Sequence, residues 1–358
     1  MPKKILLLAH DNKIGDSIIL TGLLNKIVKV WPNAEIGVLC GNVNLALYEN
    51  HPDVKWLHVS HSRSIFIRAY TSLVARFKKY DYLVYFGLDV NKSSFKKICS
   101  IINPKQRILF ANPIIKNTSD IVLEGPWSNC HISNRHLTFL RWIGSKPKYY
   151  RYDIRLSANS KKIAQNELNK SGSSKNIIIN SRGSSKDKCL SNEWLIRLII
   201  SLRKYYPKHQ FLILSTSKKD ELSLTDKFSR IDKNLRIIPY RTSIDSNLAV
   251  IKNVDAIITT DTYVVHAACA WNIPVLVLYS IHAIRDNHHV IFGPQSERYI
   301  QLIPPKKGIE AIGIKETVNS FNRLMKQKKI QKNEYFMEHG FERTCRAFNL
   351  QSIRQTFY

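Results

Sequence analysis

Short apolar runs alternate with amphipathic stretches along most of this chain, and this alternation restricts its fold more than any other feature. Lys4 to Ala9 is a continuous apolar run of strand length, as expected for a strand buried on both faces of a parallel sheet. After Asp16 the apolar residues recur at helical spacing as far as Trp31, and Pro32 ends the pattern. Strands that alternate with helices predict parallel pairing and helices on both faces of the sheet.

The alternation forms two series, separated by a stretch rich in Ser, Asn and Lys over residues 157–174. We therefore expect two doubly wound α/β domains of Rossmann type: an N-terminal one over 1–157, which would bind an acceptor, and a second over 175–305, which would bind a nucleotide. Residues 306–358 are expected to form a helical tail that packs back across the domains. Ligands of such sheets bind beyond the carboxyl ends of the strands.

The excess of positive charge in the chain indicates an anionic partner. Lys and Arg number 55 against 27 Asp and Glu, a formal net charge of +28. A hydrophobic content of 44% excludes a disordered polycation, because so apolar a chain buries a large core. The sequence has no apolar run of membrane-span length, no secretory leader pattern and no C-x-x-C pair. We expect a reduced, cytoplasmic protein without a bound metal.

The loop after the first predicted strand contains the first candidate site, Lys13-Ile-Gly-Asp16. The dinucleotide signature G-x-G-x-x-G is absent here. Gly15 would permit a tight turn, and Asp16 would lie at the start of a helix, where the macrodipole favours its ionised form. Such a carboxylate could accept a proton from an incoming hydroxyl. The alternative is that Asp16 only caps the helix.

Two loops of the second half contain the other candidates. In Thr260-Asp-Thr-Tyr-Val-Val-His266 a helix would begin at Thr262, so that free backbone N–H groups face an anion such as a diphosphate. The alternative is a simple helix cap and a packed histidine. The loop 180–194 is polar and basic and could bind phosphate, although such loops are often merely solvated. No P-loop motif is present.

Taken in order and spacing, these sites resemble glycosyltransferase family 9, the ADP-heptose:lipopolysaccharide heptosyltransferases. The first block of similarity starts at Ile14-Gly-Asp16 and ends at Trp31-Pro-Asn-Ala-Glu-Ile36, similar to the family's G-D-x-L-x-x-x-P-x-L and F/Y-P-x-A-x-I. A middle block covers 80–93. The third block, 254–275, is similar to A-x-x-V-V-x-x-D-T-G-x-x-H-L-A-A-A-L-x-x-P-x-V.

The resemblance implies a GT-B fold and a metal-independent, inverting transfer of heptose from ADP-heptose to a sugar hydroxyl of the lipopolysaccharide core, with no cofactor. Asp16 would be the general base, and Lys188 would neutralise the departing diphosphate. The residues expected to bind the donor nucleotide are Ser184, Lys186, Asp261, Thr262, Tyr263 and His266.

The chain departs from the family pattern at several positions. Tyr263 replaces a glycine next to the phosphates, and the lysine loop is one residue short, so either Lys186 or Lys188 could contact the diphosphate. The acidic residue that contacts the ribose has no clear match near 217–221. A different nucleotide sugar, or a non-catalytic relative, therefore stays an alternative.

The acceptor is expected to be a lipid A-core glycolipid, reached from the inner face of the bacterial inner membrane. Basic and aromatic residues alternate over 63–79, which suits phosphorylated sugars or anionic headgroups, although an ordinary amphipathic helix would show the same pattern. The expected acceptor contacts are Lys13, Arg63, Arg68 and Lys92.

Two other classes of protein compete with the transferase. A nucleic-acid-binding protein would share the basic charge, but the charge is spread along the chain and no recognition motif is present, so we expect no nucleic-acid partner. A nucleotide-sugar hydrolase or epimerase would need further titratable groups, for which His282, His288 and His289 are available.

Overall fold

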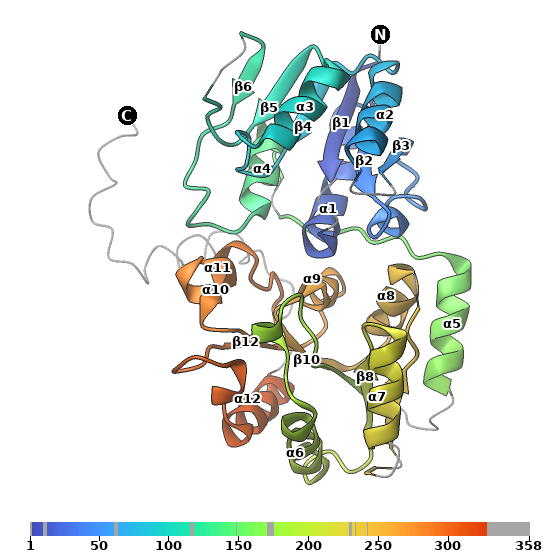
Figure 1. The fold of residues 1–358 in the computed structure, drawn as a ribbon, viewed down its shortest axis with the longest axis vertical. Helices are drawn as coiled ribbons and strands as arrows, with labels where there is room; N and C mark the ends of the chain where they lie inside the picture. Colours follow the sequence, from blue (N-terminus) through green and yellow to red (C-terminus); the bar gives the residue numbers. More distant parts are fainter. Residues whose placement is uncertain are drawn as a thin grey trace.

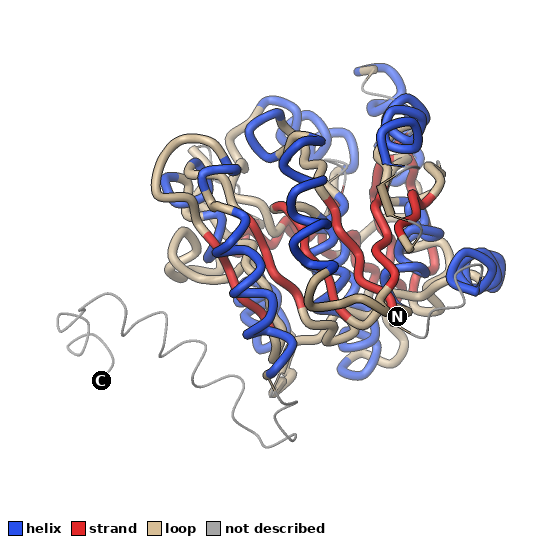
Figure 2. Tube along the Cα trace, turned by 90° about the horizontal axis from the view of Figure 1, so that it is seen from below, coloured by secondary structure: helices blue, strands red, loops and turns tan. Residues whose placement is uncertain are grey.

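A computed structural model describes residues 2–9, 13–60, 64–114, 118–147, 149–169, 175–228, 231–232, 234–241 and 243–327. The protein has two lobes, each built on one parallel sheet of six strands (Figure 1). The expectation of two Rossmann-like α/β units in the GT-B arrangement is confirmed. Helices lie on both sides of the strands when the molecule is seen from below (Figure 2).

The first lobe has the strand order β3-β2-β1-β4-β5-β6. Its strands are β1 Lys4–Ala9, β2 Glu35–Gly41, β3 Val54–Ser60, β4 Tyr82–Tyr85, β5 Gln106–Leu109 and β6 Asp120–Val122. Its helices are α1 Ile14–Val30, the 3-10 helix η1 Leu45–Leu47, α2 Ile65–Arg76, α3 Ser93–Ile102 and α4 Ser133–Trp142. The first strand pairs in parallel with β2 and β4, which explains why it is apolar throughout.

The second lobe repeats the plan with the order β12-β11-β10-β7-β8-β9. Its strands are β7 Asn176–Asn180, β8 Gln210–Leu214, β9 Leu235–Ile238, β10 Ala256–Thr260, β11 Val275–Leu278 and β12 Tyr299–Leu302. Its helices are α5 Ala158–Asn169, η2 Lys186–Lys188, α6 Asn192–Arg203, α7 Lys218–Phe228, α8 Ile244–Lys252, α9 Tyr263–Ala270, α10 His282–Arg285, α11 His288–Ile291, η3 Ile309–Ala311 and α12 Ile314–Lys326.

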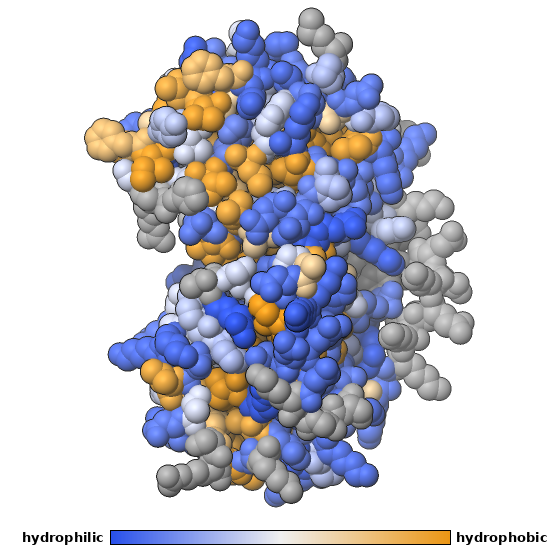
Figure 3. All heavy atoms as spheres, turned by 90° about the vertical axis from the view of Figure 1, so that its right-hand side faces the viewer, coloured by the Kyte–Doolittle hydropathy of each residue, from blue (hydrophilic) through white to orange (hydrophobic). Residues whose placement is uncertain are grey.

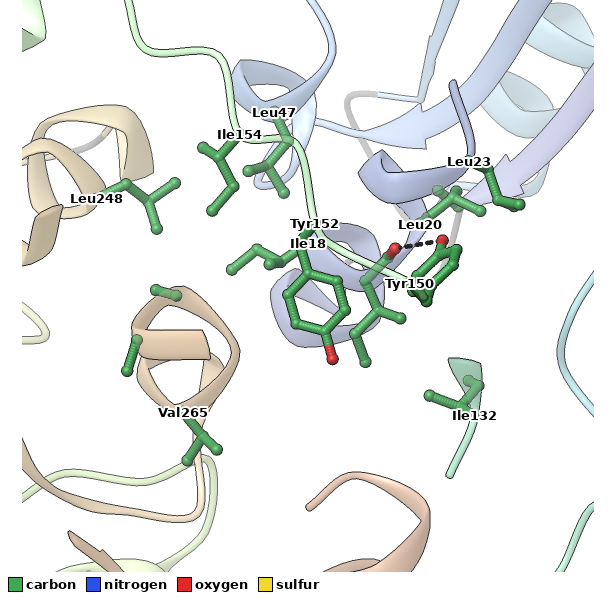
Figure 4. Packing of buried hydrophobic residues seen from close by; sticks show 14 of the residues in the cluster. Ile18, Leu20, Leu23, Leu47, Ile132, Tyr150, Tyr152, Ile154, Leu248 and Val265 are labelled. Atoms are coloured by element: carbon green, nitrogen blue, oxygen red, sulfur yellow. Dashed lines mark hydrogen bonds between the residues drawn. The ribbon is translucent and has the colours of Figure 1, made fainter. Parts of the chain in front are cut away.

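One apolar core runs through the contact between the two lobes. Tyr152, in the segment that joins them, lies beside Ile18 of α1, and Val265 of α9 lies on the other side (Figure 4). The hydroxyl of Tyr150 donates a hydrogen bond of 2.8 Å to the carbonyl oxygen of Ile19. Because α1 contacts its own lobe on one side and α9 on another, it is buried around most of its circumference.

The segments at the expected boundaries pack mainly on the second lobe. Helix α5 contacts α8, and the Ser157 hydroxyl just before α5 donates a 2.6 Å hydrogen bond to Asp245 of α8. Helix α12 contacts α6, β11 and β12. The rest of the expected tail, from 328 onward, lies outside the described residues, so packing across both lobes stays a prediction.

Candidate active site

Strands β1, β7 and β10 each lead, at the carboxyl end, into one of the three loops singled out in the sequence. Helix α1 follows β1, η2 follows β7 and α9 follows β10. The first turn of α1 meets the first turn of α9. The fold thus brings two of the three candidate loops into direct contact across the lobes.

Gly15 permits this close approach. A Cβ atom added at Gly15 would lie 2.7 Å from Cδ2 and 3.1 Å from Nε2 of His266, and 3.8 Å from Cα of Tyr263. The expectation that Gly15 forms a tight turn is wrong, because Gly15 lies within the first turn of α1. Its missing side chain makes room for a histidine of the other lobe.

Asp16 is the third residue of α1, and Lys13 is the N-cap residue. The alternative that Asp16 caps the helix is therefore wrong. Its carboxylate keeps the benefit of the helix dipole, lies 3.8 Å from Nζ of Lys13, and has a side chain that is 29% exposed. Asp16 thus presents a partly accessible carboxylate beside the contact with α9.

Arg135 of α4 lies close to Asp16 and was not anticipated from the sequence. It is only 4% exposed and donates hydrogen bonds of 2.6 Å to the carbonyl oxygen of Phe86 and 3.0 Å to that of Trp127. Burial lowers the pKa of its guanidinium, and the negative charge of Asp16 acts in the opposite direction. The sequence gives no signal for this role, because the position of Arg135 beside Asp16 depends on the packing of α4.

On the second lobe, the ends of β7 and β10 are joined by Asn180. Its amide donates to the hydroxyls of Thr259 at 3.0 Å and Thr262 at 3.1 Å. Thr262 is the N-cap of α9, and its hydroxyl accepts from the N–H of Val264 at 3.3 Å. The helix therefore begins at Tyr263, one residue later than expected.

The basic loop 180–194 places Lys188, one of its two candidate lysines, beside Asp261 at the end of β10. Nζ of Lys188 lies 2.6 Å from Oδ2 of Asp261, and both side chains are largely buried. Ser184 and Lys186 are exposed. A Cβ atom on Gly183 would lie 2.4 Å from that of Lys188, so the glycine lets the loop fold back onto itself. The geometry favours Lys188 over Lys186 as the cation closest to Asp261.

Tyr263 turns its side chain toward α8. Its hydroxyl forms a hydrogen bond with the side chain of Asn247 of α8. Burial raises the pKa of Tyr263 to about 12, and the hydrogen bond acts in the opposite direction. The side chain that replaces the family's glycine is thus held against a neighbouring helix.

Several buried polar atoms at the junction form no hydrogen bond within the described part of the chain: Nε of Arg135, Oη of Tyr152, Nδ1 of His266 and Oγ1 of Thr260. Native proteins leave few buried polar groups unpaired. These atoms come from both lobes and offer donors and acceptors to a polar ligand. Their grouping supports the junction as the site.

The buried histidines make stability sensitive to pH. Burial lowers the pKa of His131 to about 3, and burial also lowers the pKa of His266 to about 4. The unfolded chain, with histidine pKa values near 6.5, binds these protons first as the pH falls. We therefore expect the free energy of unfolding to be about 1–2 kcal/mol lower per histidine at pH 5 than at pH 7. Urea unfolding at pH 5 and pH 7 measures this difference in the free energy of unfolding. Equal values at the two pH values would contradict the burial of His131 and His266.

The remaining predicted residues lie on other elements or outside the described residues. Lys92 is exposed and pairs with Asp89 at 2.6 Å. Arg68 is half-buried on α2, and Arg63 lies outside the described residues. His282 is on α10, and His288 and His289 are on α11, where Nδ1 of His289 lies 3.1 Å from the carbonyl oxygen of Ala283. The acceptor contacts stay predictions.

In the described ranges, no cluster of three or more His, Cys, Asp or Glu side chains is arranged to hold a metal ion. No described helix combines the length and apolar character needed to cross a bilayer.

Comparison with known proteins identifies the relatives of this chain. The family model "Glycosyltransferase family 9 (heptosyltransferase)" matches residues 119–308, more than half of the chain. "Putative lipopolysaccharide heptosyltransferase 4" of Escherichia coli (strain K12) is 22% identical over 343 residues, which cover 90% of this chain and 87% of that protein.

Solved structures show the same fold. The glycosyl transferase family 9 protein from Veillonella parvula DSM 2008 superposes with a TM-score of 0.75 at 14% identity, covering 90% of this chain and 97% of the other. The E. coli ADP-heptose lps heptosyltransferase II superposes with a TM-score of 0.67 at 16% identity, covering 90% and 98%. The chain therefore belongs to glycosyltransferase family 9, and it is a glycosyltransferase.

Proposed function

We propose that this protein transfers heptose from ADP-heptose to a sugar hydroxyl of the lipopolysaccharide inner core, with inversion at the anomeric carbon and without a metal or cofactor. The observation that carries the proposal is the contact between α1 and α9, in which Gly15, the neighbour of Asp16 in the chain, meets His266 of α9, the helix that begins just after Asp261. An E. coli heptosyltransferase of the same fold is described with ADP bound.

In the proposed reaction the Asp16 carboxylate takes the proton of the acceptor hydroxyl, and the hydroxyl oxygen bonds to the anomeric carbon. The bond from that carbon to the ADP oxygen breaks on the opposite face, and ADP leaves with the electron pair. The protein must align the two substrates, provide the base and neutralise the departing diphosphate. No covalent intermediate on the enzyme is needed.

Lys188 would neutralise the diphosphate. In the structure its ammonium group is paired with Asp261, so a bound diphosphate would draw the ammonium away from that carboxylate. The N–H groups at the start of α9 lie next to Asp261 and add partial positive charge on the same side. His266, buried behind them, would be neutral at pH 7, because burial lowers its pKa to about 4.

A thermal-shift panel of nucleotides and nucleotide sugars tests the donor. A ligand at 100 times its Kd stabilises the folded state by about 2.7 kcal/mol, a shift of roughly 4 °C for a chain of this length. We expect that shift with ADP and ADP-heptose, and a smaller one with UDP- or GDP-sugars. Lys188→Ala should reduce the shift with ADP, and Lys186→Ala, in the same loop but exposed, should keep it.

Two results would contradict this proposal. Equal shifts with all nucleotides would refute a preference for the adenine nucleotide. A loss of the ADP shift in Lys186→Ala but not in Lys188→Ala would move the diphosphate contact to Lys186.

The acceptor is proposed to be a lipid A-core glycolipid, and the protein is proposed to work at the cytoplasmic face of the inner membrane. The net charge of +28 supports both, since the acceptor and the surface around it are anionic. Lys13 lies beside Asp16, where a cation would meet a phosphorylated acceptor sugar.

A further inference from the structure

Helix α2 buries small and polar side chains and exposes large apolar ones, the reverse of an ordinary surface helix. Thr71, Ser72 and Ala75 are buried against the lobe, and the Thr71 hydroxyl donates a 2.9 Å hydrogen bond to the carbonyl oxygen of Ile67. The large apolar side chains point outward instead. A surface helix normally turns its apolar stripe inward, so this arrangement leaves the apolar stripe without a partner in the described structure.

The outward stripe follows helical spacing. Phe66 is 82% exposed, Tyr70 70% and Phe77 75%, and they are joined by Leu73 in steps of four and three residues. We call the exposed large residues of this segment the α2 apolar face: Ile65, Phe66, Ile67, Tyr70, Leu73, Val74 and Phe77. Apolar residues gather on the upper lobe in Figure 3, which views the molecule from the side where α2 lies in Figure 1.

The segment that carries this face is basic. Between Asp53 and Asp81 the sequence has no acidic residue, and its cations are Lys55, Arg63, Arg68, Arg76, Lys78 and Lys79. Arg76 and Lys79 are exposed. Lys and Arg can lay their aliphatic stems along an apolar surface while their charged ends reach polar headgroups. An apolar face bordered by cations complements an anionic lipid bilayer.

The charge of the segment favours a bilayer over a second copy of the chain as the partner of this face. Two copies that met through α2 would bring the exposed Arg76 and Lys79 of one close to the same cations of the other, and like charges across an interface oppose binding. An anionic bilayer attracts these cations instead, and an amphipathic helix lies in its interface plane with the apolar side among the acyl chains.

The face also lies on the correct side of the molecule for the proposed reaction. Helix α2 follows β3 and therefore begins at the edge of the first sheet where α1 begins. Val43, after β2, and Leu88, after β4, are further exposed apolar residues at that edge. Membrane contact through α2 would hold the acceptor lobe, rather than the donor lobe, against the bilayer.

We infer that the α2 apolar face inserts into the interfacial region of an anionic bilayer and anchors the protein there. This inference rests on the proposed function only for the identity of the acceptor membrane. The binding itself requires no donor and no acceptor.

The test is co-sedimentation with vesicles of phosphatidylcholine alone or of phosphatidylcholine with phosphatidylglycerol. We expect the protein to bind the anionic vesicles, and Phe66→Ser/Phe77→Ser to bind them at least tenfold more weakly at unchanged melting temperature. The matched control is Ile200→Ser/Leu222→Ser, which removes two exposed apolar residues from α6 and α7 of the other lobe and should bind normally. High salt should weaken binding, since it screens the headgroup charge.

Two results would overturn the inference. The first is equal vesicle binding by the α2 variant and the unaltered protein. The second is a dimer in sedimentation velocity that the α2 variant converts to a monomer, which would assign the face to a second copy. Glycosyl transfer to a water-soluble, deacylated core oligosaccharide separates this inference from the proposed function. The α2 variant should transfer to this soluble acceptor at the rate of the unaltered protein. Failure of the unaltered protein to transfer to it would refute only the proposed function.

Discussion

Replacing Asp16 with asparagine should lower the rate of glycosyl transfer by about 10²–10⁴-fold, the usual contribution of a general base. Asparagine has the same shape but cannot take a proton from the acceptor. Because the residue is in the first turn of α1 and its side chain is partly exposed, loss of its charge should cost only about 0.3–1 kcal/mol of stability. Steady-state kinetics with ADP-heptose and a core acceptor measure the effect.

The Asp16→Asn experiment needs two controls. Asp226→Asn removes an exposed carboxylate from α7 and should leave the rate unchanged. The thermal shift with ADP should be the same in Asp16→Asn and in the unaltered protein, because Asp16 belongs to the other lobe. Full turnover by Asp16→Asn would show that another group accepts the proton.

Gly15→Ala should lower kcat/KM by about 100-fold, although it adds only one methyl group. The new Cβ would lie 2.7 Å from the ring of His266, closer than two carbon atoms can approach. Because the ring is buried, the methyl group must displace the His266 side chain or separate α1 from α9. A displacement of about 1 Å between reacting groups can cost 10²-fold in rate.

Gly313→Ala is the matched control for Gly15→Ala, since a Cβ there meets no atom within 4 Å. An unaltered kcat/KM in Gly15→Ala would mean that catalysis does not depend on the contact between α1 and α9.

The local pattern of the sequence was sufficient to predict the elements that determine the fold. The apolar run at 4–9 corresponds to β1, because a strand in the middle of a parallel sheet is buried on both faces. Helix α7 gives little apolar signal, because it is highly charged and buries only Leu224 and Phe228. The edge strands β6 and β12 are short and partly exposed, which leaves little pattern to detect.

The candidate site was predictable only in part. The motifs identified Asp16 and the start of α9, but the contact of Gly15 with His266 depends on how two lobes meet, which no local pattern contains. Arg135 was missed for the same reason: its proximity to Asp16 depends on how α4 packs in the folded lobe. The choice between Lys186 and Lys188 likewise required the fold, because it depends on the position of Asp261.

The ion pair between Lys188 and Asp261 has a consequence for the end of the catalytic cycle. A cation that held ADP with no other partner would retain the product and slow turnover. Here the carboxylate lies within 2.6 Å of the ammonium group and can bind it again as soon as the diphosphate moves away. On the proposed role of Lys188, Asp261 would compete with ADP for the ammonium group instead of binding the nucleotide itself, and Asp261→Ala should show slower ADP release and stronger product inhibition.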